Sequence, residues 1–293
     1  MTDVAPWIAA GRQRPRVVVL AAVNRPRVRS ELASIQRVLA QSADIVAVDE
    51  EQSFDFSNSR VDLVVTLGGD GSILNAARQM DLNQRPVVGV NLGRLGFLAA
   101  LGNSDLERIW PEICAGHYPV IEHLMLDCSV WQNGKSTHHQ LALNEAAILA
   151  GPPFSMLQID LYVDRELAST YSCDGLIIST PVGSTAHNLS AGGPILHRSL
   201  QAVVISPISP HTLTLRPVVD SSERVFEMIV RQGHASTSAV VDGRPLCTLG
   251  VGDQFRIGRA PVSFKMIAIP GKSEYQTLRE KLGWGGNPRE KNN

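Results

Sequence analysis

Residues 61–80 read VDLVVTLGGDGSILNAARQM, and this stretch decides the fold of the first half of the chain. Its apolar beginning predicts a buried strand, and its last nine residues predict a helix. Between them, three glycines in four positions surround Asp70. Glycines let the backbone turn tightly and approach a ligand closely, and the N–H groups that open a helix favour an anion such as phosphate. The stretch therefore predicts a strand, a phosphate-binding loop and a helix in succession.

Asp70 needs a chemical reason to stand in such a loop, because a carboxylate repels phosphate. Two roles fit: it holds Mg²⁺, or it accepts a proton from an attacking hydroxyl. Both roles point to phosphoryl transfer. The alternative is a glycine turn in which the aspartate caps the helix. The position after an inner parallel strand favours the functional role, because ligands of open α/β sheets bind at the carboxyl ends of the strands.

Strand and helix patterns alternate through the first hundred residues around this stretch. Short β-branched runs predict strands, and Val28, Leu32, Ile35 and Leu39 recur on one face of a helix. This alternation predicts a parallel sheet with helices packed on it. The predicted strands are 16–23, 44–48, 61–67 and 86–90, and the predicted helices lie around 28–39, 72–80 and 103–115.

The pattern changes to period two near residue 120. Apolar residues alternate with mostly polar ones at 124–130 and 157–163, which predicts half-buried antiparallel strands. Two short helices are predicted there, at 185–190 and 197–201. A last helix is predicted at 273–282, with Ser273 and Gln276 at capping-box spacing and Gly283 as its end.

The predicted fold class is α/β followed by β. A parallel α/β domain that carries the phosphate-binding loop covers 1–118, and a mostly antiparallel β domain covers 119–270. A C-terminal helix and tail, 271–293, pack on the first domain.

Composition excludes several classes of protein. The chain has 293 residues, of which 44% are hydrophobic and 19% charged, with 27 basic against 28 acidic residues. Without a basic field, and with 5% aromatic residues, we expect no nucleic-acid binding. No apolar run approaches the ~20 residues of a membrane span, so we expect no membrane partner. Four scattered cysteines predict no zinc site and a reducing, cytoplasmic setting.

Three further clusters carry polar groups suited to a ligand. Asn144 and Glu145 end an alternating stretch and could bind a base edge and a ribose diol, or be an exposed strand end. Residues 173–194 combine a buried strand, a Gly-Ser-Thr-Ala turn and a glycine pair, which is hard to explain by packing alone. Residues 207–213 place two prolines before His211, which serves either acid–base chemistry or structure. Val241-Asp242-Gly243 is most simply a hairpin turn.

Taken together, these motifs resemble those of the NAD kinase family. The resemblance covers about 60–245 in the family's order: the glycine loop, Asn91 to Phe97, Asn144-Glu145, 173–194, and the Pro-His-Thr-Leu and Arg-Pro segment at 210–217. Each motif alone is weak, whereas the ordered set is specific. The resemblance implies a phosphotransferase that uses ATP and Mg²⁺ to phosphorylate the 2′-hydroxyl of the adenosine ribose of NAD. It also implies a cytoplasmic homodimer or homotetramer.

The resemblance implies roles for individual residues. Asp70 would be the proton acceptor, the glutamate of the Asn-Glu pair would lie at a ribose, and Asp174 would meet the nicotinamide carboxamide. No metal ligand is assigned. The implied NAD-binding residues are Asp70, Gly71, Asn144, Glu145, Ser155, Ser172, Asp174, Thr185, Ala186, His187, Asn188, Leu189, Ser190 and Arg244, and the implied phosphate loop is Gly68, Gly69, Gly71 and Ser72.

Four positions depart from the family's pattern. His187 replaces a tyrosine of many bacterial members, Ser172 a basic residue, Val182 a threonine and Arg244 a glutamine. These departures leave substrate affinity, NADH tolerance and the choice between ATP and polyphosphate open.

Two other functions remain as alternatives. One is a diacylglycerol-kinase-like lipid or small-alcohol kinase, because such enzymes share the glycine loop. The other is a non-catalytic dinucleotide sensor, for which a damaged loop would be expected.

Six arginines crowd the first thirty residues: Arg12, Arg14, Arg16, Arg25, Arg27 and Arg29. They fit a solvated terminus and strand–helix loop. The alternative is a site for an anionic regulator or a phosphate tail.

Overall fold

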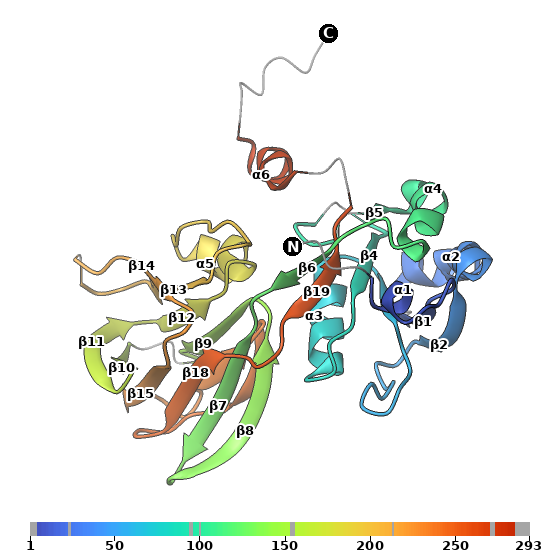
Figure 1. Cartoon of the computed structure of the whole chain (residues 1–293). Coiled ribbons are helices and arrows are strands. Elements are labelled where there is room, and N and C mark those ends of the chain that lie inside the picture. The colour runs from blue at the N-terminus through green and yellow to red at the C-terminus, as the bar shows by residue number, and fades with distance from the viewer. Residues whose placement is uncertain are drawn as a thin grey trace. The chain divides into compact units, whose positions relative to one another are not determined.

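A computed structural model describes residues 5–22, 25–93, 96–99, 101–152, 156–212, 214–269 and 273–284. The chain divides into two compact units (Figure 1). Unit 1 comprises Met1–Ala76, Arg85–Ile121 and Lys265–Asn293, and unit 2 comprises Ala77–Gln84 and Glu122–Phe264. No helix within the described ranges is long and apolar enough to cross a membrane.

A sheet with the order β2-β1-β3-β4-β19-β6 forms the centre of unit 1, and β5 pairs with β4. The pairings of β1, β2, β3, β4, β5 and β19 are parallel, which confirms the predicted parallel sheet. β3 and β4 are buried at every position, so they read as continuous apolar runs. The strands are β1 (Arg16–Ala21), β2 (Asp44–Asp49), β3 (Leu63–Leu67), β4 (Val87–Asn91), β5 (Leu101–Gly102), β6 (Val120–His123) and β19 (Phe264–Ile267).

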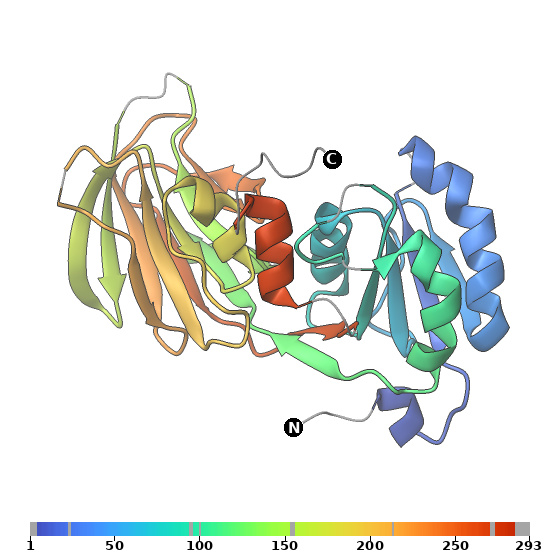
Figure 2. The same ribbon diagram turned by 90° about the horizontal axis from the view of Figure 1, so that it is seen from above.

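Helices cover both faces of this sheet. α2 (Pro26–Ser42) and α4 (Asn103–Cys114) lie together on one face, and α3 (Asp70–Met80) lies on the other (Figure 2). Trp110 of α4 ties the first two together, because its indole N–H donates to the carbonyl of Leu39 at 3.0 Å. α1 (Pro6–Ala9), which the sequence did not predict, is fixed by Trp7, whose indole donates to the carbonyl of Cys114 at 2.8 Å.

The last helix, α6 (Glu274–Leu282), forms as predicted. The Ser273 hydroxyl accepts a hydrogen bond from the backbone N–H of Gln276, and Gly283 ends the helix with φ 68°. Both signals are local in sequence, which is why they could be read without the fold.

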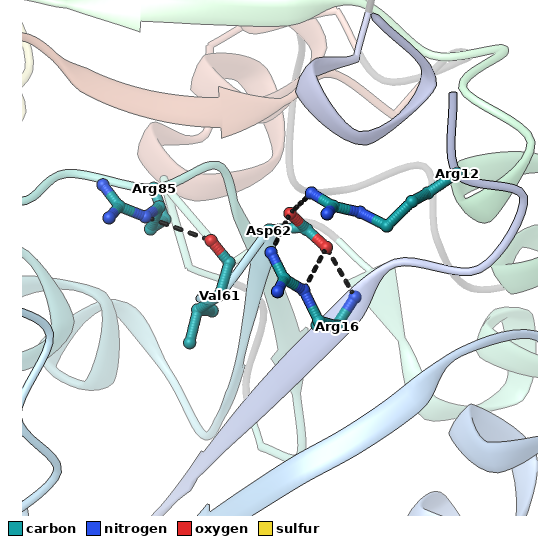
Figure 3. A network of polar contacts seen from close by, with 5 residues as sticks. All are labelled: Arg12, Arg16, Val61, Asp62 and Arg85. Atoms are coloured by element: carbon teal, nitrogen blue, oxygen red, sulfur yellow. Dashed lines mark hydrogen bonds and ion pairs between the residues drawn. The ribbon is translucent and has the colours of Figure 1, made fainter. Parts of the chain in front are cut away.

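Asp62, which directly precedes β3, links that strand to β1 through two arginines, one before β1 and one at its first position. Its carboxylate accepts hydrogen bonds from Arg12 and Arg16, and nearby Arg85 donates to the carbonyl of Val61 at 3.1 Å (Figure 3). Burial raises the pKa of Asp62, but the hydrogen bonds and charges of the arginines more than offset it and leave that pKa lowered. These arginines therefore have a structural role.

Arg14 has a structural role as well. Its guanidinium donates to three backbone carbonyls at the end of α2 and forms an ion pair with Asp44 at 2.9 Å. Half of the N-terminal arginine cluster is thus part of the fold rather than a solvated terminus.

Unit 2 contains two six-stranded sheets, ordered β11-β10-β15-β18-β7-β8 and β14-β13-β12-β9-β16-β17. Their pairings are antiparallel, which confirms the prediction from the period-two pattern. Alternate residues of both sheets meet in one core, which includes Cys128, Ile159, Ile148 and Ile178.

The strands of unit 2 are β7 (Leu126–Gln132), β8 (Lys135–Ala142), β9 (Glu145–Leu149), β10 (Leu157–Val163), β11 (Glu166–Cys173), β12 (Gly175–Ser179), β13 (Ala202–Ile208), β14 (Val218–Ser221), β15 (Phe226–Gln232), β16 (Ser238–Val241), β17 (Arg244–Thr248) and β18 (Gln254–Arg259). Two short helical turns, η1 (Gly183–Thr185) and α5 (His187–Ser190), lie where one helix was predicted.

The helix predicted at 197–201 is wrong, because this segment forms a turn. The His197 ring nitrogen Nδ1 lies 2.8 Å from the Ser199 hydroxyl and accepts from the Ser199 backbone N–H. Such local side-chain bonds compete with helix formation.

Candidate functional site

The glycine loop of unit 1 is closed by contacts that require glycine at its first position. Gly68 has φ +139°, and a Cβ there would lie 2.2 Å from the Ser72 hydroxyl. That hydroxyl donates to the carbonyl of Leu67 at 3.2 Å. Gly68 and Ser72, both predicted for the phosphate loop, thus shape the turn from β3 into α3.

Asp70, the first residue of α3, is hydrogen-bonded to a second loop, which contains residues 96–99. Its carboxylate accepts hydrogen bonds from the backbone N–H groups of Phe97 at 2.7 Å, Leu98 at 2.9 Å and Ala99 at 3.0 Å. The grip requires glycine at 96, where a Cβ would lie 1.9 Å from Asp70 Oδ1. Within the described ranges the carboxylate accepts no N–H of its own helix, so the simple capping alternative does not describe it.

Asn91 supports the loop that grips Asp70. Its side-chain oxygen accepts from the N–H of Gly93 at 2.8 Å, and its amide donates to the carbonyl of Ala99 at 3.3 Å. The sequence motif contained Asn91 but gave it no role. Its role depends on the return of the chain to the end of β4, for which the sequence has no local signal.

Beside this loop lies a pocket of about 440 Å³. Two of the four predicted phosphate-loop residues, Gly68 and Gly69, line it. The other described lining residues are Arg25, Pro26, Arg27, Val28, Asn91, Leu92 and Gly93.

In unit 2, Asp242 anchors the predicted Asn-Glu pair. Its carboxylate accepts from the backbone N–H groups of Leu143 at 2.9 Å, Asn144 at 2.7 Å and Glu145 at 3.1 Å. Asp242 and Gly243 have φ 47° and 72° and form the turn between β16 and β17, so the predicted hairpin turn is confirmed. The anchoring was missed because it depends on the pairing of β16 with β9.

Burial is the main cause of the pKa shifts of the Glu145 and Asp242 carboxyls. Burial, and secondarily the charge of Asp242, raises the pKa of Glu145 to about 8. The pKa of Asp242 is also raised by burial, although its three backbone hydrogen bonds and the charge of Arg78 oppose the rise. Glu145 Oε2 is buried with no hydrogen-bond partner among the described residues. Near neutral pH, Glu145 is therefore a protonated carboxyl able to donate a hydrogen bond.

The predicted segment 173–194 packs against the Asn-Glu pair. The Thr180 hydroxyl donates to the carbonyl of Leu143 at 2.6 Å, and the Thr180 backbone N–H donates to the carbonyl of Asn144 at 2.8 Å. A Cβ at Gly183 would lie 2.1 Å from the Asn144 carbonyl, so only glycine fits. The structure thus brings together two motifs that are forty residues apart in the chain.

Asn188 is fully buried inside this segment. Its amide donates to the carbonyls of Ser184 and Pro194 and accepts from the Ser206 hydroxyl, at 2.7–3.1 Å. Gly193 makes room for it, since a Cβ there would lie 2.0 Å from Asn188 Oδ1. The side chain thus holds the loop, and the predicted contact of this residue with a dinucleotide stays a prediction.

The neighbouring predicted residues are more accessible. Thr185, Ala186, His187 and Leu189 are half-buried, and Ser190 is exposed. Burial lowers the pKa of His187, so its ring is neutral near pH 7.

The remaining predicted residues lie at the ends of strands. His211 donates its backbone N–H to the carbonyl of Ser172 at 2.9 Å, and its Nε2 lies 4.0 Å from Asp174 Oδ1. This places the Pro-His segment beside the half-exposed carboxylate of Asp174. Arg244 is exposed at the start of β17, and Ser155 lies outside the described residues.

Comparisons with known proteins agree across nearly the whole chain. Residues 17–118 match the ATP-NAD kinase N-terminal domain, and residues 143–269 match the ATP-NAD kinase C-terminal domain. An NAD kinase of Rhodopirellula baltica is 56% identical over 96% of this chain and 90% of its own length. An NAD kinase of Azoarcus is 39% identical over 92% of both chains.

Two solved structures share the fold. A crystal structure of an NAD kinase from Archaeoglobus fulgidus in complex with ATP is similar at a TM-score of 0.76 and 25% identity, over 92% of this chain and 100% of that one. Yeast NADH kinase complexed with NADH has a TM-score of 0.84 at 22% identity, over 96% of this chain and 91% of that one. From the matched domains and the closely similar relatives, the chain belongs to the NAD kinase family.

Proposed function

We propose that this chain phosphorylates NAD with ATP, transferring the terminal phosphoryl group to the 2′-hydroxyl of the adenosine ribose to give NADP. Family membership supports the reaction as a whole. The observation that carries the chemical assignment is the fixed carboxylate of Asp70 in the glycine loop.

Asp70 is the proposed proton acceptor. A carboxylate has about four positions for accepting hydrogen bonds. Among the described residues, backbone N–H groups take two of these on Oδ1 and one on Oδ2, which leaves one position on Oδ2 for the ribose hydroxyl. Because a hydroxyl is a poor nucleophile, a rigid acceptor that aligns it and takes its proton accelerates the attack on phosphorus.

The proposed reaction uses Mg²⁺ that arrives with ATP. Within the described ranges, no three His, Cys, Asp or Glu side chains gather into a metal-binding cluster. We expect the ion to be held mainly by phosphate oxygens and water, which is the usual state of Mg²⁺ in phosphoryl transfer. When bound, Mg²⁺ neutralises part of the charge on the transferring group.

For the dinucleotide we propose the predicted binding residues of unit 2. The protonated carboxyl of Glu145 and the amide of Asn144 would bind ribose and base groups, and Asp174 would accept from the nicotinamide carboxamide. Asn188 would act indirectly, by holding the loop that carries Thr185, Ala186, His187, Leu189 and Ser190.

We also propose a cytoplasmic homodimer or homotetramer, as the family resemblance implies. Sedimentation equilibrium of the purified chain tests the assembly, and a monomer at micromolar concentration would contradict it.

The reaction is tested by NADP formation from ATP, Mg²⁺ and NAD. Asp70→Asn should fold and lose turnover by about 100-fold or more, because general-base catalysis typically contributes that much. Asp55→Asn, at an exposed loop carboxylate, is the matched control and should keep wild-type turnover. Near-normal turnover of Asp70→Asn would remove its assigned role. Wild-type protein that binds NAD but forms no NADP would favour the sensor, and activity on diacylglycerol alone would favour the lipid kinase.

A further inference from the structure

Arg25 differs from the three arginines that the fold uses. It precedes α2, is exposed, and forms no ion pair with any described residue. Its guanidinium extends over the glycine loop: Nη1 lies 3.5 Å from where a Cβ would stand at Gly68, and Nη2 lies 4.0 Å from that point at Gly71. A permanent positive charge thus lies beside the loop and makes no ion pair within the described part of the chain.

Gly69 supplies an independent observation. Its φ is not positive, and a Cβ built on it would meet no atom of a described residue within 4 Å. Neither the backbone conformation nor packing therefore requires glycine here, in contrast to Gly68. Because glycine in a loop carries an entropic cost, its use at a position open to a pocket indicates that something other than the chain needs the space.

The lining of the pocket indicates the chemistry of the occupant. Arg25 and Arg27 are among the residues that line it, and none of its described lining residues is acidic. The glycine loop adds backbone at the start of α3, where the helix dipole favours negative charge. Arginine binds phosphate oxygens with two parallel hydrogen bonds, which a single ammonium group cannot match.

We propose that Arg25 binds the terminal phosphates of the phosphate donor in this pocket, and that Gly69 keeps the room for them. The inference rests on the proposed function and adds to it a residue that sets donor affinity. It also gives Arg25 of the N-terminal cluster a role in binding the donor's phosphates, where the cluster was otherwise expected to face solvent.

Steady-state kinetics with ATP and NAD varied separately tests the proposal. Arg25→Ala should raise the KM for ATP by about tenfold or more and leave the KM for NAD unchanged, because one charge-assisted contact is lost. The KM of Arg25→Lys for ATP should lie between those of wild type and Arg25→Ala, since lysine keeps the charge but cannot form two parallel hydrogen bonds. Arg29→Ala removes the same charge from an exposed position of α2 outside the pocket lining, and it should match wild type.

Gly69→Ala tests the space in the pocket without changing charge. It should also raise the KM for ATP, whereas Gly258→Ala should not. Gly258 is a suitable control because a Cβ there meets nothing closer than 4.0 Å.

Competition by inorganic tripolyphosphate separates the phosphate chain from the nucleoside. It should inhibit competitively against ATP in wild type and lose potency in Arg25→Ala. If adenosine rather than tripolyphosphate loses potency, the pocket binds the nucleoside and the proposal is wrong. An active wild type whose Arg25→Ala and Arg29→Ala variants share one KM for ATP also overturns it, while an inactive wild type overturns the proposed function instead.

Discussion

Replacing Glu145 with Gln should change how the stability of the chain depends on pH. The Glu145 carboxyl is buried, and its pKa stands at about 8 because burial and the charge of Asp242 disfavour the carboxylate. Gln has nearly the shape of the protonated form and does not titrate. The two proteins should therefore agree where Glu145 is protonated in both the folded and the unfolded chain. They should diverge where the carboxyl ionises in the unfolded chain while the folded protein still holds its proton.

The magnitude follows from the shift of the pKa from 4.5 to about 8. A carboxyl whose pKa is higher in the folded protein holds its proton more tightly there. Its contribution to stability is thus complete below the unfolded pKa and is lost as the pH rises through the folded pKa. At ~1.4 kcal/mol per pKa unit, the wild type should lose about 3–5 kcal/mol across this window, and Glu145→Gln should not.

Urea unfolding at pH 5, 6.5 and 8, followed by circular dichroism, measures the difference. At pH 5 the two free energies of unfolding should agree within about 1 kcal/mol. At pH 8 the variant should be more stable by several kcal/mol. Glu166→Gln, at an exposed glutamate of the same unit, should follow the wild-type curve. Parallel curves for wild type and Glu145→Gln would refute the reasoning.

Three further substitutions test contacts elsewhere in the molecule. Asp242→Asn turns an amide NH₂ toward backbone N–H donors, so the free energy of unfolding in urea should fall by about 1–3 kcal/mol and the KM for NAD should rise. An unchanged KM would mean that the hydrogen bonds of Asp242 are not needed for NAD binding. Asp62→Asn should cost about 1–3 kcal/mol at pH 7 by breaking its pair with Arg16. Because the pKa of Asp62 is lowered, that difference should shrink as the pH falls through it, and a gap that does not narrow with falling pH would contradict the assignment. Gly183→Ala must displace the carbonyl of Asn144, so its KM for NAD should rise while its KM for ATP stays constant; an equal rise in both would point to general damage.

The sequence predicted those parts of the fold that depend on periodicity and on local signals. Runs such as Val17–Leu20 are apolar because both faces of a parallel sheet are covered, and the alternation at 124–130 follows from a sheet with one face in the core. The Ser273 cap and the turn at Gly283 need only neighbours in sequence. The helix predicted at 197–201 does not form because the His197 side chain bonds to the backbone and hydroxyl of Ser199, a contact that apolar spacing does not reveal.

The candidate site was predictable as motifs but not as contacts. The sequence contains Asp70, yet it does not indicate that three N–H groups some thirty residues away hold the carboxylate. Asp242 was read as a turn because its three partners lie almost a hundred residues earlier. Asn188 was predicted only as one of the residues that the resemblance places at the dinucleotide, and nothing in the sequence indicated that its amide is buried and hydrogen-bonded to Ser184, Pro194 and Ser206.

Two hairpins of unit 2 have nearly the same turn but should differ in how they accept an engineered insertion. Asn133-Gly134 has φ 52° and 74°, and Asp242-Gly243 has φ 47° and 72°. The first only reverses the chain between β7 and β8, so an epitope tag placed there would lengthen an exposed tip. A tag in the second would move the carboxylate that fixes the backbone from Leu143 to Glu145. For labelling this protein, we expect the β7–β8 tip to be the permissive site, because the β16–β17 tip holds the backbone of the Asn144-Glu145 segment in place.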